Sequence, residues 1–349
     1  MVFVGLSGGV DSSVAAWRLK QAGYKVVGVF IKVWHPEFMV CNWEAERLDA
    51  MRVAAHLEIP FLTCDAEADY KQEVADYFIS EYQAGRTPNP DVMCNQHIKF
   101  GAFLRFAREH GADFIATGHY ARREDKNGQP ALYRGKDTNK DQSYFLWTLN
   151  HEQLQATLLP IGDSTKEVIR QEAEQIGLPT ATKKDSQGIC FLGHIDIPEF
   201  MSHYFALQSG AVLNEASEVI GQHQGAVIYT IGQRHGFTIN TKNDQRQHYY
   251  VLSRDIENNT ITVGVNKPVL VSSEKIILRN IVLREVVEVG AKLEIQTRYR
   301  QTPFLVEVTA VTAEEISLLV QDTVAETASV GQSCVLYQGE LCLGGGIIS

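Results

Sequence analysis

The sequence predicts an α/β protein that begins with a doubly wound parallel sheet and continues into a half made of β-strands. Up to about residue 117, short β-branched runs alternate with helical patterns, as in parallel strands joined by crossover helices. After about residue 208 helical periodicity is almost absent, and glycine-containing turns separate β-type runs. These changes predict domains at 1–206, 207–270 and 271–349.

Each element follows from its local pattern. In the first part, β-branched runs predict strands at 2–6, 25–33, 60–64 and 113–117, and apolar residues at helical spacing predict helices at 12–22, 43–56, 67–82 and 98–110. Asn127-Gly128 lies between two polar-alternating arms at 120–134 and predicts a β-hairpin. Further helices are expected at 164–176 and 197–204, and further β-type runs at 226–230, 249–252, 260–265, 292–297 and 316–320.

Composition is that of an ordinary globular protein. The 349 residues contain no apolar run long enough to span a bilayer, and residues 2–6 lead into a polar loop rather than a cleavable signal. We therefore expect a cytoplasmic protein with no membrane partner. The net charge of −10 means that any nucleic-acid surface must be a local cluster of Lys and Arg. No CxxC pair is present, so neither a disulfide framework nor a zinc site is expected among the cysteines, which are Cys41, Cys64, Cys94, Cys190, Cys334 and Cys342.

The segment GLSGGVDSSV, residues 5–14, lies between the first strand and the first helix. Gly8 and Gly9 allow close approach of the backbone to an anion, and Ser7 and Ser12 add hydroxyl donors at a helix N-terminus. The loop is neither a Walker A motif nor a GxGxxG turn. It resembles the SGGxDS loop of the ATP pyrophosphatases, which cleave ATP between the α and β phosphates. The alternative is an ordinary strand-to-helix turn.

A second segment, GRTPNPDVMCNQHIKFG at 85–101, contains prolines at 88 and 90. These prolines are expected to exclude a regular helix and to place Asp91 and Cys94 in a rigid loop before the helix at 98–110. A thiol near a helix N-terminus has its thiolate favoured by the helix dipole. Taken alone, a cysteine such as Cys94 is more often a small buried apolar residue, but its context favours a reactive thiol.

The third segment, KKDSQGICFLG at 183–193, places Cys190 after a glycine and before an apolar pair. By composition Cys190 could also belong to the core. Two cysteines in glycine- or proline-bearing segments of one nucleotide-binding domain suggest a thiol pair that meets only in the fold. A phosphate loop combined with such a pair suggests sulfur chemistry.

These segments are part of a longer ordered series. The chain resembles the bacterial tRNA-specific 2-thiouridylase family from residue 5 to about residue 340. The motifs that carry the resemblance are SGGVDSS, GRTPNPDVMCN, IKF, ATGHYAR, KDQSYFLW, DSQGICFLG, GQHQGAVIYTIGQRHG and RYRQ. It implies an ATP-pyrophosphatase-like first domain and two small β-rich domains, the last of them a β-barrel.

The resemblance also implies a reaction. It is ATP-dependent 2-thiolation of the wobble uridine of tRNA, in which the C2 oxygen is adenylated and sulfur comes from a cysteine persulfide, with release of AMP and pyrophosphate. ATP and Mg²⁺ are the implied cofactors, although no dedicated carboxylate cage for the metal is evident. The implied partners are tRNA, with the Lys, Glu and Gln acceptors expected, and a persulfide donor fed by a cysteine-desulfurase relay.

Family roles transfer to individual residues of this chain. Cys190 corresponds to the persulfide carrier and Cys94 to the catalytic nucleophile, and the two are expected to form a disulfide that an external reductant reopens. Asp91 corresponds to a general acid/base, and it could instead cap the helix. Asn89, Pro90 and Asp91 would line the pocket for the extruded base.

The remaining implied contacts fall into two groups. The ATP contacts are Gly5, Leu6, Ser7, Gly8, Gly9, Val10, Asp11, Ser12, Gly118 and Ile31, and the family usually has Met at the last of these positions. The tRNA contacts are His119, Lys140, Asp141, Gln142, Arg298, Tyr299 and Gln332. A structural histidine at 119, simple loop residues at 141 and 142 and an exposed strand pair at 298 and 299 are the alternatives.

Other functions remain open at this point. One is a ligase of the ATP-pyrophosphatase class that adds ammonia to an adenylated carbonyl, although such an enzyme needs no paired thiols and no glutaminase-like segment is present. Another is a non-catalytic RNA-binding protein in which the nucleotide loop is regulatory. A metal cluster bound by Cys94 and Cys190 is a third, but two cysteines without local spacing support it weakly.

Overall fold

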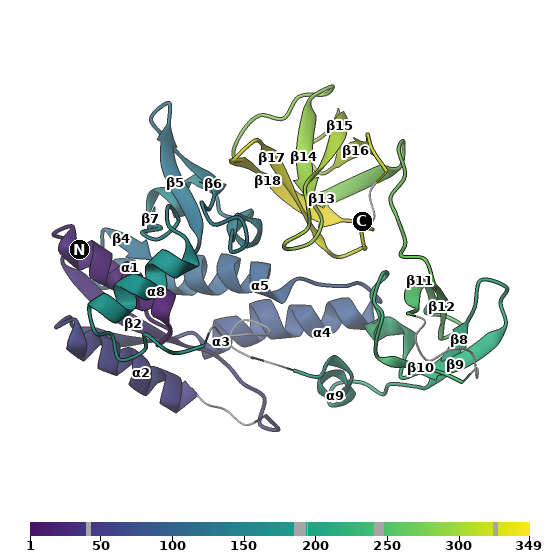
Figure 1. Ribbon diagram of the computed structural model, residues 1–349, viewed down its shortest axis with the longest axis horizontal. Coiled ribbons are helices and arrows are strands. Elements are labelled where there is room, and N and C mark those ends of the chain that lie inside the picture. The colour runs from purple at the N-terminus through teal and green to yellow at the C-terminus, as the bar shows by residue number, and fades with distance from the viewer. Residues whose placement is uncertain (40–42, 185–192, 194, 241–247, 324–326) are drawn as a thin grey trace.

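The structure is a computed structural model that describes residues 1–39, 43–184, 193, 195–240, 248–323 and 327–349. Its strands form three sheets, two of five strands and one of eight (Figure 1). The first sheet is parallel throughout and has the order β3-β2-β1-β4-β7. Its strands are β1 (Val2–Gly5), β2 (Val26–Lys32), β3 (Phe61–Asp65), β4 (Phe114–Ala116) and β7 (Thr157–Leu158).

Helices cover both faces of this sheet. Val2 and Val4 pack with one set of helices, while Phe3, between them, packs with the other, because successive strand residues point to opposite faces. The first set is α1 (Val10–Gln21), α2 (Trp43–His56) and α8 (Lys166–Gln175). The second set is α3 (Glu67–Tyr70), the π-helical η1 (Lys71–Ala75), α4 (Asp76–Gln83), α5 (Pro90–Met93), the π-helical η2 (Cys94–Ala102) and α6 (Phe103–Glu109). The predicted doubly wound sheet is confirmed.

One expectation for this region is wrong. The helix predicted at 98–110 begins at Pro90, so Asp91 and Cys94 lie in its first turns and not in a loop. Proline is well tolerated at the first helical position, where its missing N–H would have no partner in any case. Asn89 is the N-cap, since its side-chain oxygen accepts a hydrogen bond from the Val92 amide at 3.3 Å.

The remaining helices are short. They are the 3-10 turn η3 (Ser143–Leu146), α7 (His151–Gln155), α9 (Ile197–Ser202) and the 3-10 turn η4 (Ala226–Ile228). The last of these corrects the β-type run predicted at 226–230. None of the helices in the described ranges combines the length and the apolar character that crossing a membrane requires.

The second sheet has the order β10-β9-β8-β12-β11. Its strands are β8 (Gly210–Leu213), β9 (Val219–His223), β10 (Phe237–Ile239), β11 (Tyr250–Asp255) and β12 (Thr260–Gly264). The third sheet contains β13 (Lys275–Leu283), β14 (Lys292–Gln296), β15 (Phe304–Val311), β16 (Ile316–Val320), β17 (Ser333–Gln338) and β18 (Leu341–Ile348). Pairing of β13 with β18 closes these strands into the expected barrel. We refer to the three sheets with their helices as the α/β region, the central region and the barrel. The boundaries at 206 and 271 stay a prediction.

The predicted hairpin is confirmed and has an unexpected neighbour. It consists of β5 (Ala121–Lys126) and β6 (Gln129–Arg134), and Asn127 and Gly128 both have positive φ, at 53° and 79°. β6 pairs with β18 of the barrel, so the hairpin extends the barrel sheet although it belongs to the α/β region in sequence (Figure 1).

Arg284 joins the same two regions. Its buried guanidinium donates to the carbonyls of Trp147, Leu149 and Cys342 at 2.7, 2.8 and 2.9 Å. Buried carbonyls without partners are costly, so these bonds favour one placement of the barrel on the α/β region.

Candidate active site

The phosphate loop follows the carboxyl end of β1. Gly9 is the N-cap of α1 and provides no capping side chain, so the amides of the first helical turn remain oriented toward the loop. The Ser12 hydroxyl lies 3.3 Å from both the amide nitrogen and the hydroxyl oxygen of Ser7. These contacts join the two ends of the loop. Gly8 has a φ of 69°, and a Cβ there would lie 2.8 Å from that of Asp49 on α2. This arrangement is suited to an anion.

Two further predicted ATP residues border this loop. Ile31 on β2 is buried, and its Cδ1 lies 3.7 Å from the position of a Cβ built on Gly5. Gly118, after β4, approaches the loop backbone to backbone. A Cβ built on Gly118 would lie 2.6 Å from the Ser12 amide nitrogen and 2.7 Å from the Asp11 carbonyl carbon.

Gly118→Ala is therefore expected to displace the phosphate loop. Because the obstructing atoms are backbone atoms, the added methyl group cannot be accommodated by a rotamer change. We expect ATP affinity to fall by about tenfold or more, which corresponds to ~1.4 kcal/mol or more. Titration calorimetry with a non-hydrolysable ATP analogue measures this, and an unchanged Kd would contradict it.

Asp11 is engaged by two residues that the sequence did not single out. The Lys166 amine and the Tyr120 hydroxyl each lie 2.7 Å from Oδ1 of Asp11. The Lys166 side chain is only 12% exposed, and its amine also lies 5.9 Å from the centre of the Tyr120 ring. Lys166 is the first residue of α8, capped by the side chain of Thr165. The sequence analysis predicted the helix at 164–176 that carries Lys166, but nothing in that pattern indicated a contact with Asp11.

Helix α8 is tied to α1 by Arg18. Its guanidinium donates to both carboxylate oxygens of Glu172, at 2.9 and 2.6 Å, and to the Pro160 carbonyl and Ser164 hydroxyl, each at 2.9 Å. A bidentate pair of this kind sets both distance and orientation. Arg18 belongs to α1, the helix that follows the phosphate loop. By fixing α8 against α1, it holds Lys166 beside the loop.

Asn89, Pro90, Asp91 and Cys94 are brought together by the helix that starts at Pro90. Asn89 hydrogen-bonds to Tyr144 in addition to capping the helix. Cys94 is fully buried in the core on this face of the sheet. Cys190 lies outside the described residues together with the rest of 185–192, and so does Cys41. The Cys94–Cys190 pairing remains a prediction.

His119 is buried, and its Nδ1 lies 2.7 Å from the Thr117 hydroxyl. Burial lowers the pKa of His119 well below its usual value, and the charge of Lys99 lowers it further. The imidazole is therefore neutral at pH 7. A neutral, 6% exposed histidine beside Lys99 fits the structural alternative at least as well as a direct RNA contact.

Asp141 and Gln142 use their side chains inside the protein. The Asp141 carboxylate accepts hydrogen bonds from the amides of Gly135 and Ser143 at 2.8 and 3.0 Å. The Gln142 side-chain oxygen accepts one from the Tyr120 amide at 2.9 Å. These contacts shape the loop that carries Lys140.

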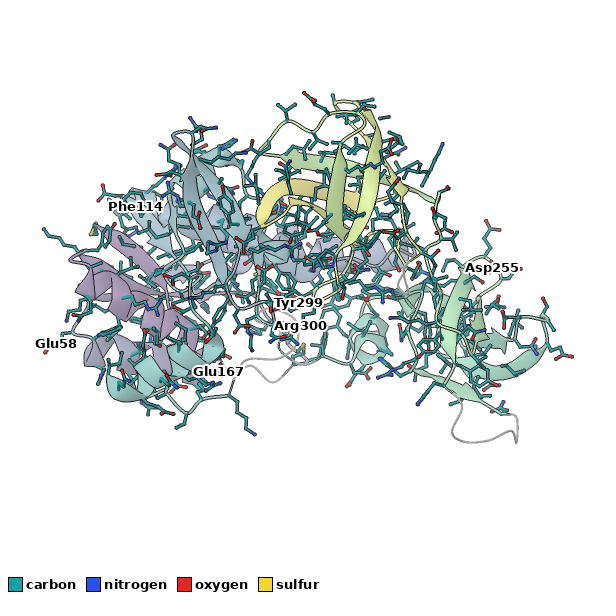
Figure 2. The ribbon with its side chains drawn as sticks, turned by 45° about the horizontal axis from the view of Figure 1, so that its top comes forward. Glu58, Phe114, Glu167, Asp255, Tyr299 and Arg300 are labelled. Carbon is teal, nitrogen blue, oxygen red and sulfur yellow. The ribbon has the colours of Figure 1, made fainter. Side chains whose placement is uncertain are left out.

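Lys140 and Tyr299 line one cavity of about 550 Å³ between the α/β region and the barrel. Tyr299 packs against Phe145, with ring centres 4.4 Å apart, and Figure 2 shows it with Arg300 near the middle of the molecule. Arg300 adds positive charge to the lining, whereas Arg134 is paired with Asp141 at 3.4 Å. Tyr299 is half-buried, and positive charge beside an aromatic ring that lines a cavity is typical of single-stranded RNA sites.

Arg298 and Gln332 connect parts of the protein to one another. Arg298 donates to the Ile231 carbonyl at 2.6 Å, which joins the barrel to the central region. The Gln332 amide donates to the carbonyls of Thr87 and Pro88 at 2.9 and 3.3 Å. Neither role was predicted, because each partner is distant in sequence.

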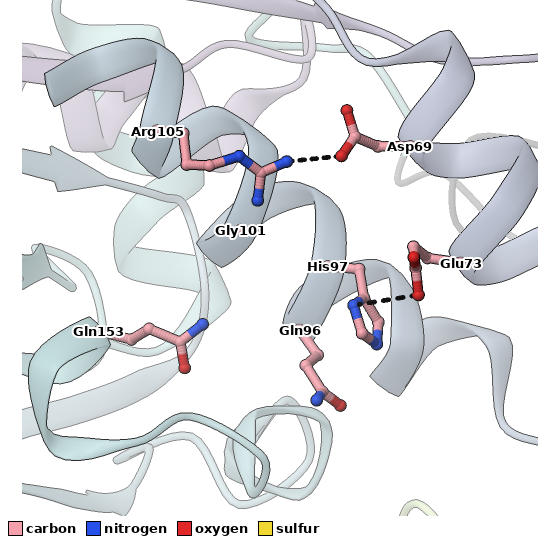
Figure 3. Close-up of a pocket in the computed structure, with 7 residues that line it drawn as sticks. All are labelled: Asp69, Glu73, Gln96, His97, Gly101, Arg105 and Gln153. Carbon is pink, nitrogen blue, oxygen red and sulfur yellow. Dashed lines mark hydrogen bonds and ion pairs between the residues drawn. The ribbon is translucent and has the colours of Figure 1, made fainter. Parts of the chain in front are cut away.

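A smaller cavity of about 260 Å³ lies beside half-exposed residues of the helix that carries Cys94 (Figure 3). It is lined by Asp69, Glu73, Gln96, His97, Gly101, Arg105 and Gln153. Arg105 pairs with Asp69 at 2.5 Å, and His97 lies 3.7 Å from Glu73. Since these charges neutralise each other, we assign this cavity no ligand.

The other described cysteines are buried in apolar surroundings. Burial raises the pKa of the Cys64 thiol to about 12 and raises those of Cys334 and Cys342 as well. A raised pKa leaves little thiolate at neutral pH, and no role is proposed for these three cysteines. Over the described part of the chain, no group of three or more His, Cys, Asp and Glu side chains is arranged to hold a metal ion.

Known proteins resemble the whole chain. Residues 1–194 match the profile described as "tRNA methyl transferase HUP domain", residues 198–265 the "tRNA methyl transferase PRC-barrel domain" and residues 274–348 the "Aminomethyltransferase beta-barrel domain". The tRNA-specific 2-thiouridylases MnmA of Escherichia coli O1:K1 and Shigella boydii serotype 4 are each 46% identical to it over 354 residues, which covers 99% of this chain and 96% of theirs.

Solved structures resemble parts of it. The U34-tRNA thiolase NcsA from Methanococcus maripaludis is 19% identical with a TM-score of 0.33, covering 51% of this chain and 56% of that one. A 4-thiouridine synthetase bound to RNA and ATP is 21% identical with a TM-score of 0.35, covering 55% and 45%. On the full-length match at 46% identity, the chain belongs to the tRNA-specific 2-thiouridylase family that its motifs indicate.

Proposed function

We propose that the protein is a tRNA-uridine 2-sulfurtransferase that uses ATP to replace the C2 oxygen of the wobble uridine with sulfur. One observation carries this proposal beyond family membership. An anion loop with Lys166 at its side and a helix start bearing Asn89, Asp91 and Cys94 belong to the same α/β region. That combination provides what adenylation followed by thiol chemistry requires.

The loop accounts for the first step. The C2 oxygen of uridine is a poor leaving group, and joining it to AMP with loss of pyrophosphate makes it a good one. Ser7, Gly8, Gly9 and Ser12 would bind phosphate oxygens, and Lys166 would neutralise part of their charge. Mg²⁺ usually keeps few protein ligands and would be held mainly by the phosphates, with the Asp11 carboxylate at the loop, which also bonds to Lys166 and Tyr120, as a protein ligand.

Two cysteines account for the second step. The terminal sulfur of a Cys190 persulfide forms a bond to C2 while AMP leaves with the former C2 oxygen. The Cys94 thiolate then attacks the Cys190 sulfur, which breaks the sulfur–sulfur bond and leaves sulfur on C2 and a Cys94–Cys190 disulfide. An external thiol reductant reopens that disulfide. Asp91 would act as the general acid/base for these transfers.

The tRNA would bind across the α/β region and the barrel. Asn89, Pro90 and Asp91 would hold the extruded uridine, and Lys140 and Tyr299 would contact neighbouring nucleotides. His119, Asp141, Gln142, Arg298 and Gln332 would support these contacts from the positions described above. The Lys, Glu and Gln acceptors, a cysteine-desulfurase relay and a cytoplasmic location belong to the same proposal.

The reaction is tested directly. The purified protein is incubated with ATP, Mg²⁺, sulfide and unmodified tRNA bearing a wobble uridine, and the digested nucleosides are analysed for 2-thiouridine. We expect 2-thiouridine and AMP in equal amounts from the wild type. We also expect Cys190→Ser to retain activity with free sulfide. Formation of AMP without 2-thiouridine would contradict the proposal and indicate a different acceptor.

A further inference from the structure

The four residues Gly85–Pro88, which we call the lead-in segment, connect α4 to the helix that starts at Pro90. Contacts with other parts of the protein, in addition to the two helices that it connects, determine the position of this segment. All three regions of the protein form hydrogen bonds to this segment, and its residues other than Arg86 are buried. The segment precedes Asn89, Asp91 and Cys94 directly, so its position sets where that helix begins.

The central region makes the first contact. Arg254 on β11 donates from Nη2 to the Gly85 carbonyl at 2.6 Å and from Nη1 to the Tyr229 carbonyl. The Thr230 hydroxyl, next to Tyr229, lies 3.0 Å from the Thr87 hydroxyl. One guanidinium therefore bridges the central region and the lead-in segment.

The barrel makes the second contact. The Thr87 amide donates to the Val330 carbonyl at 3.0 Å, and the Gln332 side chain donates to the Thr87 carbonyl at 2.9 Å. Gly331 lies between these two partners. A Cβ there would lie 2.9 Å from both the amide nitrogen and the carbonyl oxygen of Thr87, so barrel and segment touch backbone to backbone.

The α/β region makes the third contact. Arg86 forms a two-point ion pair with Glu81 of α4, with distances of 2.8 and 2.5 Å. Pro88 and Pro90 restrict the chain on either side of Asn89. A displacement at Gly85 or Thr87 is therefore passed to the helix start and is not absorbed by a flexible linker.

We propose that Arg254 is a positioning residue for thiolation, holding the lead-in segment so that Asn89, Asp91 and Cys94 stand in the reactive arrangement. Thr87 completes this connection through its contacts with Thr230 and the barrel. The inference rests on the proposed roles of Asn89, Asp91 and Cys94. Displacing reacting groups by about 1 Å costs a reaction on the order of 100-fold in rate, so loss of this contact should reduce turnover.

The test compares Arg254→Met with the wild-type full-length protein. We expect kcat for 2-thiouridine formation at saturating ATP and tRNA to fall at least about tenfold. A loss of this size is smaller than the roughly 100-fold that a displacement of the reacting groups by about 1 Å produces. The Kd values for tRNA and ATP should change less than about twofold, because the Arg254 guanidinium is engaged by the protein's own Gly85 and Tyr229 carbonyls. Hydrogen exchange should become faster at the amides of 85–89 and remain unchanged in β1. Arg279→Met, which removes an exposed barrel arginine, serves as the matched control.

A second pair of variants covers the case in which Arg254→Met does not fold. Thr87→Val removes only the hydroxyl, whereas Thr87→Ser keeps it, so kcat should fall in the first and largely recover in the second. Unchanged kcat in both Arg254→Met and Thr87→Val would overturn the inference. A weakened tRNA Kd with unchanged kcat would overturn it too, since Arg254 would then act on RNA binding. Activity of Cys94→Ser would instead contradict the proposed site itself.

Discussion

Replacing Lys166 with methionine is expected to weaken ATP binding roughly 30-fold while leaving AMP binding within about twofold. The reason is electrostatic. The loop residues 5–12 contain no lysine or arginine and carry the negative charge of Asp11, so a protein cation that balances the triphosphate together with Mg²⁺ must come from elsewhere. Lys166 is placed for this role, 2.7 Å from Asp11 and 12% exposed. A hydrogen bond to a charged group contributes about 2 kcal/mol, which corresponds to roughly 30-fold in Kd.

Calorimetric titrations with AMP and with a non-hydrolysable ATP analogue in the presence of Mg²⁺ measure the two affinities. Lys166→Arg keeps the charge and should retain most of the ATP affinity. Lys20→Met removes a lysine near the other end of α1, where Lys20 bonds to the Leu57 carbonyl, and should have no effect on either nucleotide. Equal losses for ATP and AMP in Lys166→Met would mean that the loop had collapsed and that no phosphate contact had been removed.

Cys94→Ser is expected to lower 2-thiouridine formation by at least about 1,000-fold with no loss of ATP or tRNA affinity. Serine fits the buried position in the helix because only the sulfur atom changes. Its hydroxyl is a far weaker nucleophile than a thiolate at neutral pH, so the disulfide with Cys190 cannot form. Single-turnover assays of 2-thiouridine and AMP, with sulfur supplied through the Cys190 persulfide by a persulfide donor and not as free sulfide, separate these effects when combined with binding measurements.

Cys64→Ser is the matched control for this variant. Cys64 is also buried in the α/β region, on β3, and burial raises the pKa of its thiol to about 12. It should remain active. Comparable loss of activity in Cys64→Ser and Cys94→Ser would show that serine disturbs the buried core, whereas full activity of Cys94→Ser would exclude Cys94 as the nucleophile.

Much of the fold could be predicted because it depends on neighbours in sequence. The β-branched run at 2–6 predicted the first strand, and in the structure Val2 and Val4 pack on one face of the sheet and Phe3 on the other. Asn127-Gly128 adopts the positive φ angles that a tight hairpin needs. The error at Pro90 was also local, since the same proline that cannot continue a helix is well suited to begin one.

The site could be predicted only in part. Loop residues 5–12 were identified by glycine and serine spacing, and Asn89, Asp91 and Cys94 by their motif. The partners of Asp11, by contrast, are Tyr120 and Lys166, and the partner of Gly85 is Arg254, which is 169 positions away. No local pattern distinguishes these residues from other lysines, tyrosines and arginines.

The sequence by itself determined the order of the elements, the anion loop, the family and the residues proposed for the reaction. These properties depend on backbone propensities and on motifs read within a few residues. Only the tertiary structure decided that β6 pairs with β18, that Lys166 faces Asp11, and that Arg254 and Gln332 hold the segment before Asn89. Folding buries polar groups from distant parts of the sequence next to one another. Each buried group needs a hydrogen-bond partner, and the packing of the whole chain decides which residue that partner is.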